Sequence, residues 1–374
     1  MHELESVLAG LRRFPDTEAP NLFAVDPTDR LLLDSVPAAL QVNPDVQIAV
    51  VGDRYGALTL GAAVQFGATD IRVHQDSSTS EAALARNAAA VGLSEVYGNF
   101  SLGEDLLQTA DVVLLQLPRS IAELTEVIEV IAAYAPNDVL VLAGGRDKHM
   151  FPAMNDILRK NFETFSAGRG RQKSRVLSAA TPIRSTSRTY PVTQTLEDIG
   201  LTVVAHGAVF AGSTLDIGTR FLLEHERKMK RDAQVVVDLG CGTGIVACML
   251  ARERKGVRVL ATDRSTAAVD SARATAEANG LAVEVLRDDA MATLEDDSVD
   301  LIVCNPPFHE GAAVHTGGAE KLFAAAGRVL RPGGELWTVY NWHLNYRAAL
   351  AKAVGPTEVR GKNKKFTVTR STVA

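Results

Sequence analysis

The distribution of apolar and polar positions along the chain predicts an alternation of short buried strands and helices. The segment that begins at Gln47 consists of an apolar β run, a glycine-bearing turn, a helix, a second apolar run, a polar turn and an Ala-rich helix that ends in Gly-Leu. Short apolar runs that alternate with helices of this length are typical of a parallel sheet covered by helices on both faces. The pattern therefore predicts a doubly wound α/β fold.

The same pattern occurs a second time from Gln234, which indicates two domains built on one plan. A slip of one residue also aligns the apolar run after Asp111 with the run after Asp300. At 374 residues the chain is too long for one ordinary hydrophobic core. When the two repeats are aligned without gaps, their glycines coincide as follows: Gly52 with Gly240, Gly56 with Gly244 and Gly92 with Gly280.

We therefore expect two tandem doubly wound (Rossmann-like) α/β domains, residues 1–188 and residues 189–374. The boundary is expected in the basic, Ser/Thr-rich stretch between Gly168 and Thr195, which would form a linker at the end of the first domain. The second domain ends in a predicted strand, helix and strand, at 336–341, 346–354 and 366–369. This ending favours an antiparallel hairpin that closes the second sheet.

Composition excludes several classes of protein. Hydrophobic residues make up 46% of the chain and charged residues 22%, as in soluble globular proteins. No apolar run approaches the ~20 residues that span a bilayer, and the N-terminus has no apolar signal core, so we expect a cytoplasmic protein without membrane contact. A monomer is compatible with the sequence. The cysteines lack metal-ligand spacing, so we interpret them as reduced, buried thiols and expect no metal: Cys241, Cys248 and Cys304.

The formal net charge of −6 at first argues against a nucleic-acid partner, but the basic residues are clustered. Residues 168–190 contain six Lys or Arg and no acid, and residues 355–374 contain five against the single acid Glu358. A third basic cluster precedes the second repeat. Each cluster alone is equally well explained as a solvated linker or helix end. Together they permit an RNA partner.

The second repeat carries a candidate cofactor loop, in the segment VVVDLGCGTGIV. Asp238 stands at the end of a predicted strand, and Gly240, Gly242 and Gly244 follow before a helix. Glycines let the backbone approach a ligand closely, and the helix N-terminus offers free N–H groups. Ligands of open α/β sheets bind beyond the carboxyl ends of the strands, where this loop lies. The D-x-G-x-G-x-G spacing differs from the G-x-G-x-x-G spacing of dinucleotide sites.

Acidic residues also end the next two predicted strands of the second repeat. Asp263 is placed to accept hydrogen bonds from both hydroxyls of a ribose, and Asp289, which follows Asp288, can accept from an adenine amino group. Any single aspartate here is more often a turn or helix-cap residue. The ordered set favours an adenosine with an uncharged ribose, which predicts S-adenosyl-L-methionine as the cofactor.

The segment Asn305-Pro306-Pro307-Phe308 follows the strand DLIVC and is the candidate catalytic motif. The exocyclic amine of guanine or adenine is a poor nucleophile because its lone pair is delocalised into the ring. The Asn305 side-chain oxygen and the Pro306 carbonyl can accept both N–H bonds of such an amine and aim it at a methyl donor. Phe308 offers a flat face on which a base can stack. After the glycine loop and the two acidic strand ends, this motif predicts an N-methyltransferase.

The first repeat has lost these features, so we expect a catalytically inactive domain that holds substrate or braces its partner. An arginine side chain where the loop needs none would obstruct a cofactor, and the acceptor for ribose is missing. The aligned pairs are Asp238 with Val50, Gly242 with Arg54, Asp263 with Gln75, Asn305 with Gln116, Pro306 with Leu117 and Phe308 with Arg119.

On these residues the chain resembles the two-domain ribosomal RNA guanine-N2 methyltransferases of bacteria, which join a degenerate and an active class I methyltransferase domain. The resemblance covers nearly the whole chain and includes AHGAVFAGSTLDIGTRFLLEH, VVDLGCGTG, CNPPFHEG and YNWHLNYRAALAKAVG followed by NKKF. The last pieces are most similar to the large subunit methyltransferase G type, with the small subunit methyltransferase C type as the near relative.

The resemblance implies methyl transfer from S-adenosyl-L-methionine to the N2 amine of a guanine in 23S ribosomal RNA, free or in a ribosomal particle. It implies that Phe210 lies near the cofactor or target base, although a core aromatic is an equally good interpretation. Lys364, Lys365 and Phe366 would lie beside the target pocket. Alternatives are a 16S rRNA guanine, adenine-N6 or protein glutamine methylation, and a non-catalytic RNA-binding assembly factor. His309, Glu310 and His315 are not expected to bind metal.

Overall fold

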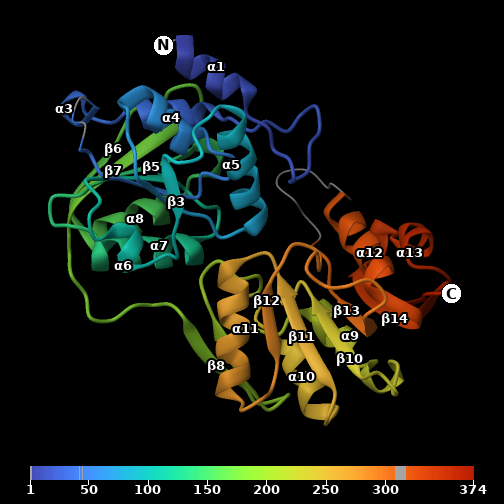
Figure 1. Ribbon diagram of the computed structural model, residues 1–374. Coiled ribbons are helices and arrows are strands. Elements are labelled where there is room, and N and C mark those ends of the chain that lie inside the picture. The colour runs from blue at the N-terminus through green and yellow to red at the C-terminus, as the bar shows by residue number, and fades with distance from the viewer. Residues whose placement is uncertain (1, 42, 44, 308–316) are drawn as a thin grey trace. The chain divides into compact units, whose positions relative to one another are not determined.

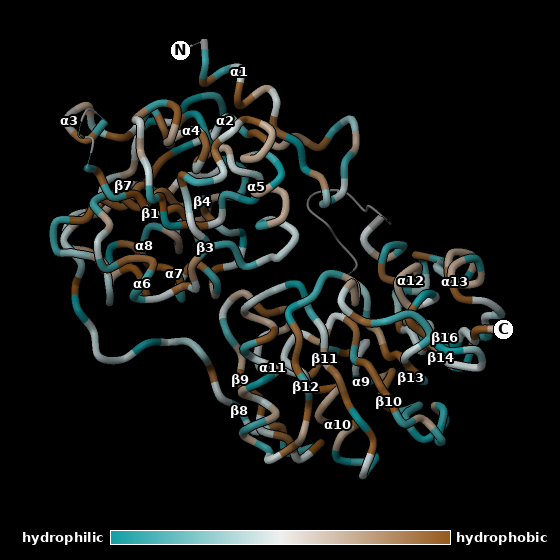
Figure 2. Tube along the Cα trace, in the orientation of Figure 1, coloured by the Kyte–Doolittle hydropathy of each residue, from teal (hydrophilic) through white to brown (hydrophobic). Residues whose placement is uncertain are grey.

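The computed structural model describes residues 2–41, 43, 45–307 and 317–374, and it divides the chain into two compact units, residues 1–190 and 191–374 (Figure 1). Each unit is described by itself. In each, a seven-stranded sheet lies between helices, as expected when apolar strands must be buried on both faces. Figure 2 shows hydrophobic residues along the central strands of both units.

The sheet of the first unit has the strand order β3-β2-β1-β4-β5-β7-β6. The first five strands are parallel, and β7 is antiparallel to both β5 and β6. Its strands are β1 (Ile48–Val51), β2 (Ile71–His74), β3 (Tyr97–Asn99), β4 (Val112–Gln116), β5 (Leu140–Arg146), β6 (Phe162–Ala167) and β7 (Ser174–Pro182). Its helices are α1 (His2–Gly10), α2 (Pro27–Asp34), α3 (Ala38–Gln41), α4 (Ala57–Phe66), α5 (Ser78–Ala90), α6 (Glu104–Leu107), α7 (Ile121–Tyr134), the 3-10 helix η1 (Asp147–His149) and α8 (Pro152–Asn161).

The sheet of the second unit repeats this topology, with the order β12-β11-β10-β13-β14-β16-β15 and an antiparallel β16. Its strands are β10 (Val235–Leu239), β11 (Arg258–Asp263), β12 (Glu284–Arg287), β13 (Val299–Cys304), β14 (Leu330–Asn341), β15 (Thr357–Lys362) and β16 (Phe366–Thr372). Its helices are α9 (Ile217–Leu223), α10 (Ile245–Glu253), α11 (Thr266–Ala278), α12 (Gly317–Val329) and α13 (Arg347–Ala353), with the 3-10 helices η2 (Glu226–Lys228) and η3 (Trp342–Leu344).

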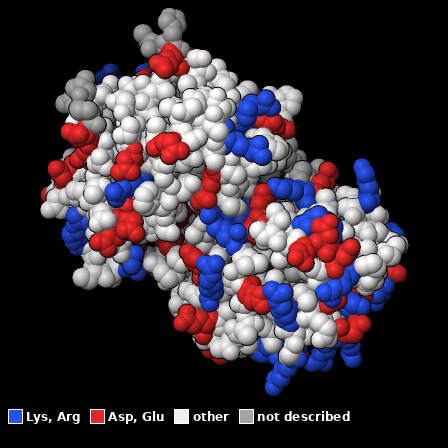
Figure 3. All heavy atoms as spheres, viewed as in Figure 1, with Lys and Arg blue, Asp and Glu red and all other residues white. Residues whose placement is uncertain are grey.

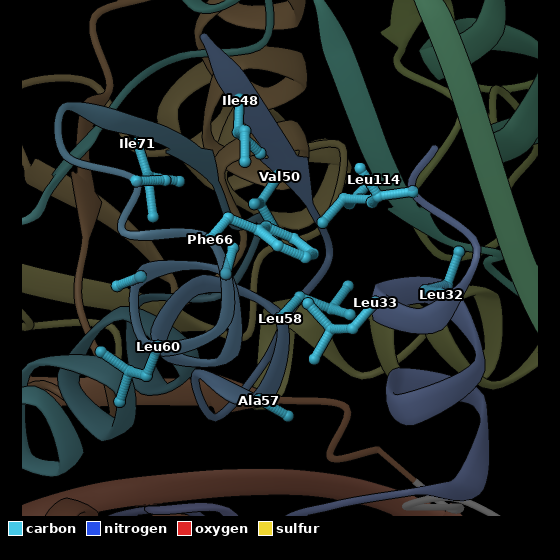
Figure 4. Packing of buried hydrophobic residues seen from close by; sticks show 14 of the residues in the cluster. Leu32, Leu33, Ile48, Val50, Ala57, Leu58, Leu60, Phe66, Ile71 and Leu114 are labelled. Atoms are coloured by element: carbon cyan, nitrogen blue, oxygen red, sulfur yellow. The ribbon is translucent and has the colours of Figure 1, made fainter. Parts of the chain in front are cut away.

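Alternation along the strands places two hydrophobic cores on each sheet, one on either face. In β1, Ile48 and Val50 belong to the core that α2 and α4 cover, whereas Ala49 and Val51 belong to the opposite core. Figure 4 shows the first of these cores, where leucines of α2 and α4 pack beneath β1. Two equivalent cores cover the sheet of the second unit. The doubly wound fold predicted for both halves is confirmed.

The terminal antiparallel hairpin predicted for the second half is also present, but the first half has one as well. Residues 174–182 lie in the stretch that was expected to be a linker, yet they form β7 and pair with β5. The reason is burial: Leu177 and Ala179 pack into one core of the sheet and Val176 into the other. Of the six basic residues in 168–190, only Arg175 stands on this strand, and the other five lie in the turn before it or in the segment after it.

The second unit begins with a two-stranded antiparallel hairpin, β8 (Val192–Leu196) and β9 (Leu201–Ala205). It is fixed to α11, because Thr275 Oγ1 accepts from the Val204 N–H and Asn279 Nδ2 donates to the Thr202 carbonyl. The loop after β9 and helix α9 then lead to β10. The hairpin therefore anchors the loop that leads toward the candidate site.

Candidate active site

The candidate site lies at the carboxyl edge of the second sheet, where β10, β11 and β13 end side by side. These strands are parallel, with Leu239 in register with Thr262 on one side and Cys304 on the other. The glycine loop, Asp263 and Asn305 therefore leave the sheet at the same edge, where ligands of open α/β sheets bind.

The glycines of the loop have left-handed backbone conformations, with φ of +75° at Gly240, +53° at Gly242 and +75° at Gly244. A Cβ at Gly240 would meet no atom within 4 Å, and one at Gly242 would meet only Val209 at 3.9 Å. Gly244 differs, since a Cβ there would stand 2.9 Å from the Cβ of Ala272 in α11. Gly240 and Gly242 thus leave open space along the loop, whereas Gly244 permits close helix packing.

Asp238 is directed inward and is only 3% exposed. Its Oδ2 accepts a hydrogen bond of 3.0 Å from the Ala247 N–H in the first turn of α10. Burial raises the pKa of Asp238 to about 7, the Ala247 hydrogen bond opposes this shift, and the negative charge of Asp263 adds to it. The carboxylate therefore holds the glycine loop against α10, and a direct contact with the cofactor stays a prediction.

Asp263 stands half-buried at the end of β11 and fixes the loop from the other side. Its Oδ2 accepts from the Gly242 N–H at 3.1 Å, and its Oδ1 accepts from the Ser265 N–H at 3.0 Å. Each carboxylate oxygen can accept more than one hydrogen bond, so these two contacts do not exclude a ribose. Ribose binding by Asp263 stays a prediction that fits this geometry.

The two acids after β12 have different surroundings. Asp288 is buried and accepts from the N–H groups of Ala292 and Thr293 and from the Thr293 hydroxyl, so it stabilises its own turn. Asp289 is more exposed and forms an ion pair with Lys321 of α12. A contact between Asp289 and adenine, which also stays a prediction, would have to share this carboxylate with Lys321.

Asn305 is held by its amide nitrogen, while its oxygen is left available. Nδ2 donates to Asp216 Oδ2 at 3.1 Å and to Thr219 Oγ1 at 2.9 Å. Oδ1 is buried and has no hydrogen-bond partner among the described residues. A buried carbonyl oxygen without a partner costs free energy, typically about 1–3 kcal/mol. The arrangement presents an oriented acceptor, as binding of an amine requires.

The rest of the predicted catalytic motif is only partly described. Pro306 is buried and Pro307 is exposed, directly after Asn305. Phe308 lies outside the described residues, as do His309, Glu310 and His315. The stacking role predicted for Phe308 stays a prediction.

The segments before and after these strands contribute residues with unequal exposure. Phe210 is 67% exposed, so it is not a core aromatic, and the neighbouring Val209 is the residue that approaches Gly242. Lys364 and Lys365 are exposed, whereas Phe366 is buried. A Cβ at Gly218, in the first turn of α9, would meet the Phe366 ring at 3.1 Å. Phe366 therefore packs beneath α9 rather than offering a free face.

Asp216 and Thr219 are functional candidates that the sequence analysis did not single out. Asp216 is the N-cap of α9, and its Oδ2 accepts from the Thr219 N–H at 3.0 Å. The signal was local: an aspartate three residues before a threonine, ahead of an apolar run, is a typical helix start. That these cap residues also hold Asn305 could not be read from the sequence, because 86 positions separate Thr219 from Asn305.

The three free cysteines of the second unit are buried. Burial raises the pKa of Cys241 and Cys304 well above the usual range and that of Cys248 to about 12, so these free cysteines stay protonated. Within the described ranges, no group of three His, Cys, Asp or Glu is arranged to hold a metal ion. No helix of the described residues is both long and apolar enough to cross a membrane.

The fold and the site of the second unit define a class I methyltransferase domain: a parallel sheet closed by an antiparallel strand, a glycine loop after its first strand, and Asn-Pro-Pro after its fourth. Family models agree. Residues 200–370 match the Methyltransferase small domain, and residues 2–183 match the RLMG N-terminal domain.

Curated relatives are similar over almost the whole chain. The ribosomal RNA large subunit methyltransferase G of Streptomyces coelicolor is 34% identical over 96% of this chain and 97% of its own length. The protein of the same name from Shewanella amazonensis is 29% identical over 96% and 94%. The chain belongs to the ribosomal RNA large subunit methyltransferase G family. Among solved structures, a T. thermophilus 16S rRNA N2 methyltransferase in complex with AdoMet and guanosine shares the fold, with a TM-score of 0.76, 23% identity and coverage of 93% and 92%.

Proposed function

We propose that this chain transfers a methyl group from S-adenosyl-L-methionine to the exocyclic N2 amine of a guanine in large-subunit ribosomal RNA. The observation that carries the proposal is the buried, unpartnered Oδ1 of Asn305 at the edge of the sheet where the glycine loop lies. The names of the curated relatives and the guanosine in the T. thermophilus complex support the choice of substrate. Such a substrate places the enzyme in the cytoplasm.

The chain's own residues form a cradle that fits the cofactor. The backbone at Gly240 and Gly242 borders open space that any side chain would fill, and Asp263 stands at its rim with acceptor capacity for ribose hydroxyls. When bound, S-adenosyl-L-methionine supplies an electrophilic methyl group on a sulfonium. Asp238 keeps the loop in this shape from beneath.

Asn305 orients the nucleophile. Because Asp216 and Thr219 accept from its Nδ2, the amide is fixed with Oδ1 toward the substrate side, where it accepts one N–H of the guanine amine. The Pro306 carbonyl accepts the other. These two acceptors draw the amine lone pair out of conjugation and hold it in line with the methyl group, an effect of orientation and fixed dipoles.

The reaction balances without a residue that acts as a base. The new N–C bond forms as the methyl–sulfur bond breaks, and the methylated amine loses its proton to water. The guanine must leave its stack to reach Asn305, which costs a few kcal/mol and less in a loop than in a helix. We expect the lysine and arginine clusters to supply phosphate contacts and salt-dependent binding.

The test uses the full chain, methyl-labelled S-adenosyl-L-methionine and unmodified 23S and 16S rRNA, with nucleosides identified by mass spectrometry. Label is expected as N2-methylguanosine in 23S rRNA. The matched variant Asn305→Ala should lose transfer while it retains donor binding, measured by calorimetry. Label in protein, in DNA or on adenine would overturn the proposed substrate, and unchanged turnover of the variant would overturn the proposed mechanism.

A further inference from the structure

We propose that Trp342 and the neighbouring lysine turn, residues 362–365, form a subsite for the nucleotide beside the target base, with the indole stacked on its base and the lysines on its phosphate. The proposal rests on the proposed function in that the substrate is RNA. It assigns the binding of a flanking nucleotide to residues that lie outside the methyl-transfer machinery.

The two tryptophans of the chain have opposite environments. Trp337 in the middle of β14 is fully buried, with 0% of its surface exposed, whereas Trp342 is 56% exposed. Trp342 is the first residue of η3, directly after β14. β14 runs parallel to β13, with Thr338 in register with Cys304, so the strand delivers Trp342 to the same edge of the sheet as Asn305. An exposed indole offers a large flat surface for stacking.

A chain of contacts connects Trp342 to the acceptor residue. The backbone N–H of Trp342 donates to the backbone carbonyl of Lys365 at 3.0 Å. The next residue, Phe366, packs under the start of α9 at Gly218, and two residues earlier Asp216 accepts from Asn305. From the register, Trp342 lies three residues beyond Val339, the partner position of Asn305 on the adjacent strand, or roughly 10 Å further along the strand direction. A nucleotide next to the target base can bridge a separation of this size.

The turn beside Trp342 carries positive charge in a fixed backbone. Asn363 Oδ1 accepts from the N–H groups of Lys365 and Phe366, at 2.8 and 2.7 Å, which closes the turn. Lys362, Lys364 and Lys365 are exposed, and none forms an ion pair with another described residue. Figure 3 shows basic and acidic side chains interspersed over the visible face of the second unit.

The combination of a flat aromatic face and adjacent unpaired cations identifies the ligand as single-stranded nucleic acid. An acidic peptide would use the lysines but would gain little from an exposed indole, whereas a nucleotide uses both. Stacking on an aromatic side chain tolerates any base, so the subsite holds the strand without selecting its sequence. We therefore expect it to contribute to affinity for RNA and little to the methyl-transfer step itself.

Tryptophan fluorescence gives a direct test because only Trp342 is accessible. The probe is an eight-nucleotide single-stranded RNA with one central guanosine, and a second version carries abasic sites on both sides of that guanosine. RNA should quench the emission of the wild-type chain and leave that of Trp342→Phe, which reports only Trp337, unchanged. Quenching in Trp342→Phe equal to that of the wild type would overturn the proposal.

Affinity separates the two parts of the subsite. Trp342→Ala should bind the normal oligonucleotide about tenfold more weakly, and Phe should retain part of that affinity. The abasic probe should weaken wild-type binding by a similar factor and Trp342→Ala no further. Lys364→Gln and Lys365→Gln should each lower the salt dependence of binding by close to one phosphate contact, whereas the control Lys255→Gln, an exposed lysine just beyond α10, should not.

Equal affinity of Trp342→Ala and the wild type, or a further loss with the abasic probe, would overturn the stacking role. The same preparations are assayed for methyl transfer to guanosine as the free nucleoside, which lacks flanking nucleotides. If the oligonucleotide binds through Trp342 and no methyl is transferred to any RNA, the proposed function fails while the subsite stands. If transfer to rRNA occurs and Trp342→Ala binds normally, the subsite fails alone.

Discussion

In both units an aspartate accepts a hydrogen bond from the equivalent amide in the first turn of the helix after the first strand, yet the two aspartates occupy different sequence positions. In the second unit Asp238 accepts from Ala247. In the first unit Val50 stands where Asp238 would be, and Asp53 accepts instead from Thr59, the residue aligned with Ala247, at 2.8 Å. In both units an aspartate accepts from a backbone N–H at the start of the helix. Only in the second unit does the glycine turn border open space that a ligand could enter.

The acceptor position shows the same division. Gln116 aligns with Asn305, and its Nε2 donates to Asp29 of α2 as Asn305 donates to Thr219 of α9. The starts of α2 and α9 also correspond, since both have an aspartate N-cap and Asp29 aligns with Thr219. The first unit has the same partly buried contact between the fourth strand and this helix. It has changed the residue that would face an amine.

The glycine loop makes the contrast sharpest. Arg54 has φ of +54°, and Gly242 at the equivalent position has φ of +53°. The backbone of the first unit therefore has a left-handed conformation that favours glycine, although an arginine occupies the position. Burial raises the pKa of Glu123 to about 7, the charge of Asp76 adds to this shift and the charge of Arg54 opposes it, so Arg54 lies near an acidic side chain of its own unit. The two units share the hydrogen bonds that hold the helix starts, whereas they differ in the residues that would face a ligand in the second unit.

The largest effect is expected when the arginine of the first unit is introduced into the glycine loop of the second unit. Gly242→Arg is expected to weaken binding of S-adenosyl-L-methionine by at least about a hundredfold, because the side chain fills the open space beside the loop while the backbone tolerates it, as at Arg54. Calorimetry measures the affinity, and circular dichroism checks the fold. The reciprocal Arg54→Gly should not create binding, since Gln75 stands where Asp263 would be. Wild-type affinity in Gly242→Arg would contradict this account.

Exchanging the acceptor amide should have the next largest effect. Asn305→Gln introduces the residue that the first unit carries and displaces the amide by one methylene from the position that Asp216 and Thr219 fix. We expect the rate of methyl transfer to fall by about 10²–10³, as for other lost electrostatic contacts in active sites, with donor affinity unchanged. Single-turnover kinetics with labelled donor measures the step. A rate close to that of the wild type would show that Oδ1 is not the acceptor.

The parts of the molecule that the sequence predicted are those with a local signal. Apolar runs and glycine turns predicted the two sheets, and the Asn-Pro-Pro motif marked Asn305 because its chemistry depends on neighbouring residues. The strand β7 was missed because basic residues precede and follow it and Arg175 stands on it, while the apolar positions around Leu177 and Ala179 are few. A pattern of charge alone cannot tell a linker from a buried strand between basic turns.

The contacts that orient the site could not be predicted, because each joins residues far apart in the sequence. Asp216 and Thr219 reach Asn305 across 89 and 86 positions. Asp289 forms its ion pair with Lys321, 32 positions away. The inward direction of Asp238 depends on how α10 packs over β10, which the sequence of the strand does not reveal.

The orienting contact can be tested at Thr219 with matched variants. Thr219→Val keeps the shape but removes the acceptor for Asn305 Nδ2, so the amide loses one of its two anchors. We expect kcat to fall about tenfold with little change in KM, since an interaction with an active-site group costs about 1–2 kcal/mol. Thr219→Ser should restore the rate. In the Asn305→Ala background Thr219→Val should not lower the residual single-turnover rate further, and additive losses would indicate a merely structural role.

The smallest effects should appear in the pH dependence of stability, where the two capping aspartates can be compared directly. Burial raises the pKa of Asp53 to about 6 and that of Asp238 to about 7, from ordinary values of 3.8. Between pH values of about 4 and 7, the native state therefore holds a proton on these aspartates that the unfolded state has already lost. The free energy of unfolding consequently falls as the pH rises through this range. Asp53→Asn and Asp238→Asn should each make the free energy of unfolding less dependent on pH. Each kcal/mol of lost pH dependence corresponds to about 2–4 °C in melting temperature. We expect the cationic sulfonium of S-adenosyl-L-methionine to bind in the second unit, where it would favour ionised Asp238, and not near Asp53. Adding the donor should therefore flatten the profile of the wild type and of Asp53→Asn while leaving that of Asp238→Asn unchanged, and an equal response of all three chains would show that the two caps do not differ in their exposure to a ligand.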